Sequence, residues 1–139
     1  MIILDTNVVS ELMRPSPSAR LADWFSKQPP EAPHTTTITL AEIFYGIELL
    51  PEGKRRAMLQ AGAQTMFSNV FANRIFTFDI EAAHAFSRIA ADRRKRGRPI
   101  AEMDAQIAAI AQLHGATLAT RNTADFEGCG IRLANPWLD

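Results

Sequence analysis

Asp104 occupies a position where an apolar residue is expected. The segment 100–114 predicts a helix, and Asp104 lies in the apolar stripe that Ile107, Ala108 and Ala111 form on it. An unpaired carboxylate buried in such a stripe would be costly. Either Asp104 is a first-turn acid that favours the helix dipole, or a positive partner lies beside it.

Asp5 directly follows the apolar run Ile2-Ile3-Leu4, which is typical of a buried parallel strand. In open parallel sheets, ligands bind beyond the carboxyl ends of the strands. Asp5 is therefore a candidate site residue. A role as the cap or first-turn acid of the next helix would explain it equally well.

A second predicted strand, residues 116–120, runs into the segment RNTADF at 121–126. One interpretation makes Asn122 the cap of a short helical turn, supported by Asp125 three residues later, as in a capping box. The other makes Asn122, Asp125 or both oxygen ligands at the sheet edge that carries Asp5. Thr120, at the strand end, would then orient one of them.

Glu42 lies outside the main apolar stripe of a helix predicted over residues 39–50, on a face with Thr39 and Gly46. Taken alone, it is most simply a solvent-facing glutamate. The helix is apolar nearly all round, however, so this face can also be covered, and Gly46 leaves room beside the carboxylate.

Carboxylates that converge need a counter-charge, because two unit charges about 4 Å apart repel by about 4 kcal/mol at an effective dielectric constant of 20. Mg²⁺ or Mn²⁺ supplies such a charge and takes oxygen ligands. The single Cys129 and the scattered His34, His84 and His114 offer no softer metal site. One or two ions would activate a water for attack on a phosphoryl group, so the acids predict phosphodiester hydrolysis without a protein nucleophile.

The elements that position these acids alternate between strand and helix, which predicts an α/β fold with a mainly parallel central sheet flanked by helices. Thr6 or Asn7, Thr39 and Asp79 are predicted helix caps, and Gly115 a helix stop. Strands are predicted at residues 2–4, 35–37, 75–78, 116–120 and 131–133, and helices at about 6–13, 19–27, 39–50, 54–71, 80–96 and 100–114.

The length of 139 residues predicts a single domain, 1–139, with 47% hydrophobic and 22% charged residues. The formal net charge is zero, so any nucleic-acid site must be local. The start MIILDTN lacks a basic segment, so we expect no signal peptide, and no apolar run approaches membrane-spanning length. We expect a cytoplasmic protein with no membrane partner.

The sequence resembles the PIN-domain ribonucleases, in particular the VapC-type toxins of toxin–antitoxin pairs. The resemblance covers nearly the whole chain. Its motifs, in order, are LDTN at 4–7, LAE at 40–42 with Gly46, Asp104 followed by IA at 107–108 and Ala111, and ATRNTADF at 119–126. Each motif alone is weak, but the four together in this order are specific.

The resemblance implies an endoribonuclease that depends on Mg²⁺ or Mn²⁺, with one or two ions, and that cleaves tRNA, rRNA or mRNA. It implies a cognate antitoxin protein as partner, and a homodimer or a toxin–antitoxin hetero-oligomer. Carried over by motif, Asp5, Glu42 and Asp104 are metal-binding catalytic acids and Asp125 is the fourth. Some relatives have Asp where this chain has Asn122, which leaves Asn122 as a neutral ligand or orienting group. Thr6 and Thr120 support the acids.

An RNA substrate also needs positive charge. Arg94, Arg96 and Arg98 belong to the basic run at 93–98, and Arg121 is nearer to the proposed site. These arginines either contact phosphates, which predicts salt-sensitive binding, or form a solvated helix end.

Two further functions compete with a ribonuclease. A catalytically inactive PIN-like module would bind RNA or protein without cleavage, but the complete set of acids disfavours it. A phosphatase of small molecules usually has a second acid two residues after a nucleophilic Asp, and residue 7 is Asn.

Overall fold

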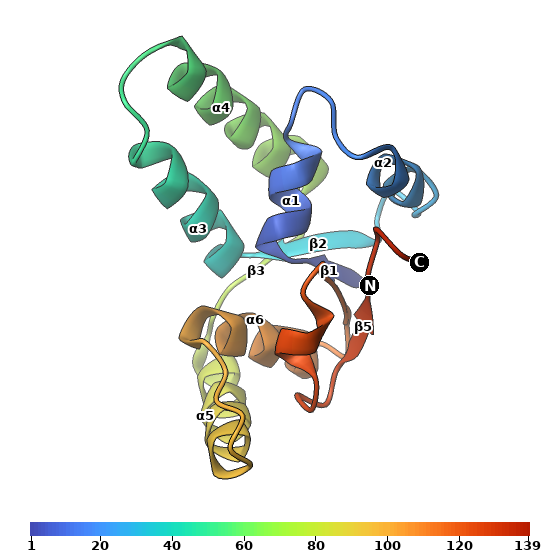
Figure 1. The fold of residues 1–139 in the computed structure, drawn as a ribbon, viewed down its shortest axis with the longest axis vertical. Helices are drawn as coiled ribbons and strands as arrows, with labels where there is room; N and C mark the ends of the chain where they lie inside the picture. Colours follow the sequence, from blue (N-terminus) through green and yellow to red (C-terminus); the bar gives the residue numbers. More distant parts are fainter.

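A five-stranded, all-parallel sheet forms the middle layer of the molecule (Figure 1). The computed structural model describes residues 1–139. The strands are β1 (Ile2–Leu4), β2 (Pro33–Thr36), β3 (Ile75–Phe76), β4 (Thr117–Ala119) and β5 (Arg132–Ala134), in the spatial order β3-β2-β1-β4-β5. The predicted α/β class and parallel sheet are confirmed.

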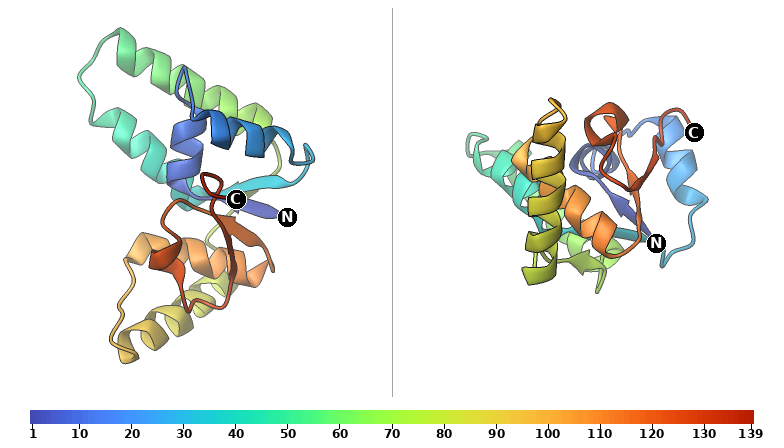
Figure 2. Two further views of the ribbon diagram at one scale, coloured as in Figure 1. Left: turned by 45° about the vertical axis from the view of Figure 1, so that its right-hand side comes forward. Right: turned by 90° about the horizontal axis from the view of Figure 1, so that it is seen from below.

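Helices cover both faces of this sheet (Figures 1 and 2). One face carries α1 (Thr6–Leu12), α2 (Ala19–Ser26), α3 (Thr37–Glu48) and α4 (Lys54–Thr65), and the other carries α5 (Ile80–Lys95) and α6 (Glu102–Leu113). A π-helical turn, η1 (Met66–Val70), continues α4, and a 3-10 turn, η2 (Thr123–Phe126), follows β4. None of the helices is long and apolar enough to cross a membrane.

The strands divide their side chains between two cores. Ile3 and Leu118 pack with α5 and α6, whereas Leu4 and Ala119 pack with the helices of the opposite face. This division follows from the two-residue period of a strand. Because both faces are covered, β1 reads as an unbroken apolar run in the sequence.

Two helices have other caps than Thr6, Asn7 and Thr39; α1 begins at the predicted residue 6, whereas α3 begins earlier than predicted. Asp5, rather than Thr6 or Asn7, caps α1, and Thr36, rather than Thr39, caps α3. Asp5 is the first residue after β1, and Thr36 is the last residue of β2. Both keep an extended backbone, and each helix follows its strand without a loop. The first turn of each helix therefore starts at the sheet edge.

The other boundary predictions were mostly sound. Asp79 caps α5 by accepting a hydrogen bond from the Ala82 N–H at 2.9 Å, and Gly115 ends α6 with a φ of 61°. The predicted helix at 54–71 instead changes to a π-helical turn at Met66, and β3 is shorter than predicted. The predicted side-chain cap of Asn122 is wrong, because Asn122 makes no capping hydrogen bond.

Leu118→Ala should lower the free energy of unfolding by about 2–5 kcal/mol, because it leaves a cavity in the core under α5 and α6. Urea denaturation measures the change. Leu138→Ala is the matched control, since Leu138 is 71% exposed and its loss should change stability by less than about 0.5 kcal/mol. Equal effects of the two substitutions would contradict the burial of Leu118.

Candidate active site

The site lies at the topological switch point of the sheet, between β1 and β4, where the strand order changes direction. β1 pairs with β2 on one side and with β4 on the other, and Leu4 is in register with Ala119. The residues that follow them, Asp5 and Thr120, therefore emerge side by side at the carboxyl edge of the sheet. This switch point is where open α/β sheets bind ligands.

Asp5 is buried, with 4% of its surface exposed, and three groups hold its carboxylate. Oδ1 accepts a hydrogen bond from the Thr6 N–H at 2.8 Å, and Oδ2 accepts from Thr120 Oγ1 at 2.7 Å and Asn7 Nδ2 at 3.3 Å. Burial raises the pKa of Asp5, and these hydrogen bonds offset only part of that rise. Both sequence interpretations hold for this residue: Asp5 caps α1 and also lies at the strand end with the other acids.

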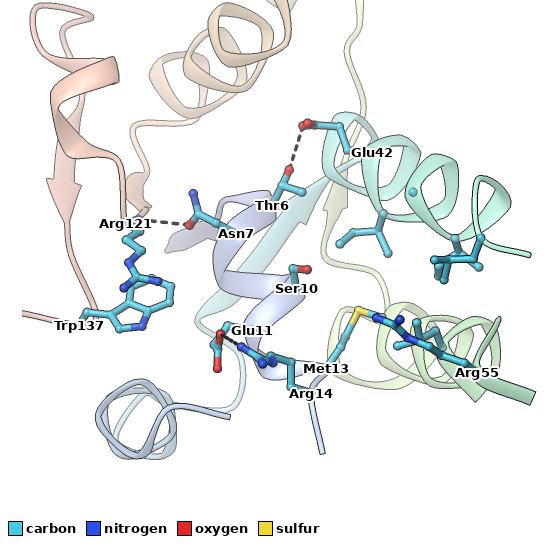
Figure 3. A pocket seen from close by; sticks show the side chains of 15 residues that line it. Thr6, Asn7, Ser10, Glu11, Met13, Arg14, Glu42, Arg55, Arg121 and Trp137 are labelled. Atoms are coloured by element: carbon cyan, nitrogen blue, oxygen red, sulfur yellow. Dashed lines mark hydrogen bonds and ion pairs between the residues drawn. The ribbon is translucent and has the colours of Figure 1, made fainter. Parts of the chain in front are cut away.

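Thr6 connects Asp5 to Glu42. Its Oγ1 donates to Glu42 Oε1 at 2.9 Å (Figure 3). Its backbone N–H donates to Asp5, and its Oγ1 also lies 3.1 Å from Thr39 Oγ1. Glu42 belongs to α3, one turn after Thr39. It is therefore turned toward α1 rather than being an ordinary solvent-facing glutamate. The part that Thr39 plays was not predicted, although its position on the same helix face as Glu42 was visible in the sequence.

Asp104 lies half-buried in the first turn of α6. Burial raises the pKa of Asp104 to about 6, and the charges of Asp5, Asp125 and Glu42 contribute to the rise in that order. No hydrogen bond within the chain lowers the pKa of this carboxyl group. The other three predicted acids are thus within electrostatic reach of Asp104, and a favourable helix dipole alone does not account for its environment.

Asp125 and Asn122 lie on the turn that follows β4 and are both exposed. The Asn122 N–H donates to Thr120 Oγ1 at 3.1 Å, and no capping box forms. The Asp125 charge raises the pKa of Asp5 as well as that of Asp104. The charge that this turn presents to the other acids is therefore that of Asp125.

The donor chemistry of this cluster suits a hard divalent cation, which prefers carboxylate and hydroxyl oxygens. Asp104 is the best indicator, because its half-buried carboxylate receives no hydrogen bond and is repelled by the other acids. As they stand, no three Asp, Glu, His or Cys side chains are close enough to hold one ion together. Mg²⁺ usually keeps several of its waters and is held through one or two carboxylates, and Asp5 is the acid whose carboxylate has a fixed position.

A groove of about 620 Å³ opens beside Glu42, between α1, α3, α4 and the C-terminal segment (Figure 3). Three arginines line it: Arg14, Arg55 and Arg121. The Arg121 guanidinium lies 4.9 Å from the ring centroid of Trp137. The arginines outnumber the acids of the groove, where Glu11 pairs with Arg14 at 3.3 Å and Glu42 lies at the end nearest the site.

The basic run at 93–98 is divided between the surface and the interior. Arg94 is exposed, Arg96 pairs with Asp92 and donates to the Gly128 carbonyl at 2.8 Å, and Arg98 lies 3.6 Å from Glu127. Arg93 is buried, which no local pattern in the sequence indicates. Arg96 and Arg98 therefore hold the segment after η2, whereas Arg94 has no partner in the chain.

The fold and the site define an α/β domain with clustered acids at the topological switch point. The chain belongs to the PIN-domain family, whose profile matches residues 2–128. The resemblance seen in the sequence is thereby confirmed.

Three relatives match the chain over nearly its full length. The plasmid stability protein StbB of Pseudomonas syringae pv. tomato is 42% identical over 99% of both chains. The VapC ribonuclease Y4jK of Sinorhizobium fredii is 36% identical, over 99% of this chain and 98% of the relative. Toxin FitB of Neisseria gonorrhoeae is 37% identical over the whole of both chains, and the crystal structure of FitAcB from that organism superposes with a TM-score of 0.93 over the whole of both chains.

Asp104→Asn should stabilise the metal-free protein at pH 7 by about 1 kcal/mol, a value reduced for the partial exposure of the carboxyl group. Folding raises the pKa of Asp104 from 3.8 to about 6, so the wild type loses stability as the pH rises through this window. The asparagine side chain carries no such penalty, because it does not ionise. The stabilisation should therefore be full above pH 6 and nearly absent below pH 4.

Urea denaturation in EDTA at several pH values between 4 and 7 measures this difference. Asp23→Asn on α2, where the side chain is 63% exposed, is the control, and its free energy of unfolding should differ little from that of the wild type. An Asp104→Asn protein that is less stable than the wild type at pH 7 would show that the carboxylate is not under repulsion.

Proposed function

We propose that the chain is an endoribonuclease that depends on Mg²⁺ or Mn²⁺ and acts as the toxin of a toxin–antitoxin pair. The observation that carries this proposal is the place of Asp104, a half-buried carboxylate without a hydrogen bond and within electrostatic reach of three other acids, which together raise its pKa. The names of the relatives, VapC ribonuclease Y4jK and Toxin FitB, support the same function.

In this proposal the four acids hold one or two cations. When bound, such a cation lowers the pKa of a coordinated water and stabilises charge on the phosphoryl group under attack. Asp5 is the fixed acid, because Thr6, Thr120 and Asn7 hold its carboxylate. Thr6 orients Glu42, while Asp104 and Asp125 approach from α6 and from the turn after β4. Asn122 serves as a neutral ligand or orienting group.

The groove beside Glu42 is the proposed path of the RNA. Arg121, Arg55 and Arg14 would contact phosphates, since cationic side chains supply most of the affinity for a nucleic-acid backbone. Of the basic run, Arg94 is the most available for phosphate contact, and Arg96 and Arg98 would contribute from the end of α5 and the α5–α6 connection. The net charge of zero makes these local contacts necessary.

We also propose that a cognate antitoxin restrains the toxin in the cytoplasm, in a homodimer or a toxin–antitoxin hetero-oligomer. The relative named Toxin FitB supports a toxin, and the open groove beside the acids offers a surface that an inhibitor would cover. The alternative, a catalytically inactive PIN-like module that binds RNA or protein, is distinguished by a cleavage assay.

Asp5→Asn should lower the rate of RNA cleavage by about 100-fold or more, because it removes the charge of the fixed acid. Asparagine keeps an acceptor for the Thr6 N–H, so the cap of α1 is preserved, which Asp5→Ala would sacrifice at about 1 kcal/mol. The assay uses a mixed tRNA and rRNA pool with Mg²⁺, Mn²⁺ or EDTA, and EDTA should abolish cleavage by the wild type.

Asp23→Asn, prepared identically, should cleave as the wild type does, since Asp23 lies on α2 with its side chain 63% exposed. Equal cleavage by wild type and Asp5→Asn would indicate a contaminating nuclease. A folded wild type that binds RNA but never cleaves it would favour the binding module.

Arg121→Gln should raise the KM for RNA with little change in kcat and reduce the salt slope of binding by about one, because one phosphate contact is lost. Binding titrations between about 50 and 200 mM salt, roughly the range over which such slopes are resolved, measure it. Arg88→Gln on α5 is the control and should keep the wild-type slope. A slope unchanged in Arg121→Gln would exclude Arg121 from the RNA path.

A further inference from the structure

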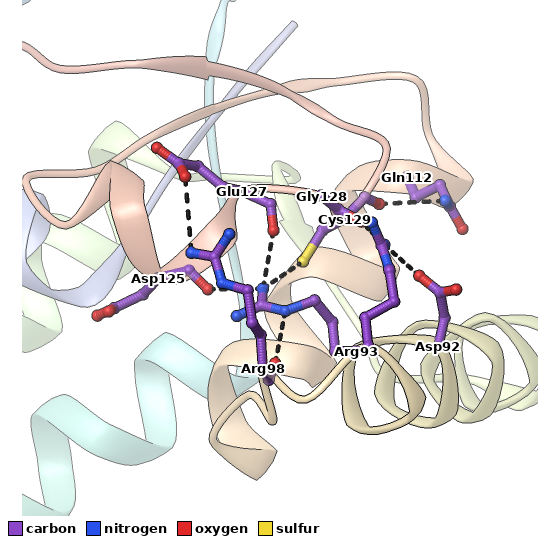
Figure 4. Close-up of polar contacts among 9 residues, drawn as sticks. Asp92, Arg93, Arg98, Gln112, Asp125, Glu127, Gly128 and Cys129 are labelled. Carbon is purple, nitrogen blue, oxygen red and sulfur yellow. Dashed lines mark hydrogen bonds and ion pairs between the residues drawn. The ribbon is translucent and has the colours of Figure 1, made fainter.

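Arg93 is a buried cation without a carboxylate partner. It belongs to the last turn of α5, and 5% of its surface is exposed. Its Nη1 donates to the carbonyls of Asp125 at 2.9 Å and Glu127 at 3.0 Å and to Cys129 Sγ at 3.3 Å, and its Nε donates to the Arg98 carbonyl at 2.8 Å (Figure 4). A buried charge is expensive unless hydrogen bonds compensate it, and here backbone carbonyls supply most of them.

These contacts join two segments that are far apart in the sequence. The Arg98 carbonyl belongs to the connection between α5 and α6, and α6 carries Asp104. The carbonyls of Asp125 and Glu127 belong to the segment that carries the fourth acid. One guanidinium therefore fixes the backbones that bring two of the four acids to the site.

The direction of the Asp125 side chain agrees with this role. Figure 4 shows the Asp125 carboxylate pointing away from Arg93, while the Asp125 carbonyl faces it. Arg93 thus holds the residue by its backbone and leaves the carboxylate free. Arg96 and Arg98 reach the same segment from the surface, through Gly128 and Glu127, but both are more than half exposed.

We propose that Arg93 is a positioning residue that fixes the backbone of Asp125 relative to the α6 helix that carries Asp104, and that cleavage depends on it although it touches neither RNA nor cation. This inference rests on the proposed ribonuclease function. The neutral Arg93→Met removes all four hydrogen bonds, and Arg93→Lys keeps the charge with fewer donors in a different geometry. Displacement of a catalytic group by about 1 Å is enough to cost on the order of 100-fold in rate.

The test is a double-mutant cycle of Arg93→Met and Asp125→Asn in the cleavage assay with Mn²⁺. Arg93→Met should lower kcat by about 10- to 100-fold, because the Asp125 carboxylate is then misplaced. The KM for RNA should stay within about twofold of the wild-type value, because Arg93 does not contact RNA. In the Asp125→Asn background it should lower kcat by less than about twofold, since the residue through which it acts is already removed. Arg93→Lys should recover part of kcat, and Arg88→Met should behave as the wild type.

Additive losses in the cycle, or wild-type kcat in Arg93→Met, would overturn the proposal. Amide hydrogen exchange of Arg93→Lys tests the proposal without an activity assay, and it still serves if Arg93→Met fails to fold. The amides of residues 125–129 should exchange about tenfold faster than in the wild type, while those of β1 stay unchanged. Unchanged exchange at 125–129 would also overturn it. A wild type without metal-dependent cleavage would instead overturn the ribonuclease function, whatever the exchange shows.

Discussion

The pairing of β1 with β4 is the constraint on which the site depends. The Asp5 N–H donates to the Ala119 carbonyl at 2.9 Å, which continues the ladder one residue beyond the strands and fixes Asp5 beside Thr120. Residues that are 115 positions apart in the sequence thereby share a hydrogen bond of 2.7 Å. Because the apolar neighbours Leu4 and Ala119 are completely buried, a slip of this register would move the acid and break both cores.

Around this fixed point the carboxylates of the other acids accept fewer hydrogen bonds than that of Asp5 does. Glu42 is tethered to Thr6 through one carboxylate oxygen, Asp104 is carried by a packed helix but receives no hydrogen bond, and Asp125 lies on an exposed turn. The charges of the other three acids are among the causes that raise the pKa of Asp104. Such an arrangement combines one immobile acid with three that can adjust, which suits a site whose charge changes when a ligand enters.

The sequence predicted the strands and the acids that depend on local patterns. It did not predict contacts between segments that are distant in the chain. Apolar runs marked the strands, and a carboxylate inside an apolar stripe marked Asp104, because periodicity reports which residues face a core. The cap of α3 was misplaced at Thr39, and for α1 the sequence left Asp5 and its neighbours Thr6 and Asn7 all open, since several adjacent polar residues satisfied the same local rule. Arg93 looked like part of a solvated helix end, because the carbonyls of Asp125 and Glu127 that it binds come more than 30 residues later in the chain.

Asp5 and Arg93 are the two buried charged residues of the chain, and they do not pair with each other. A direct ion pair between them would offset much of the desolvation of both groups. It would also occupy the Asp5 carboxylate and lower its pKa, whereas the pKa of Asp5 is raised. Instead, the backbone from Asp125 to Glu127 accepts the hydrogen bonds of Arg93, and Asp5 stays among other acids. The negative charge at the sheet edge is thereby left without a cationic side chain, which is what the proposed cation site requires.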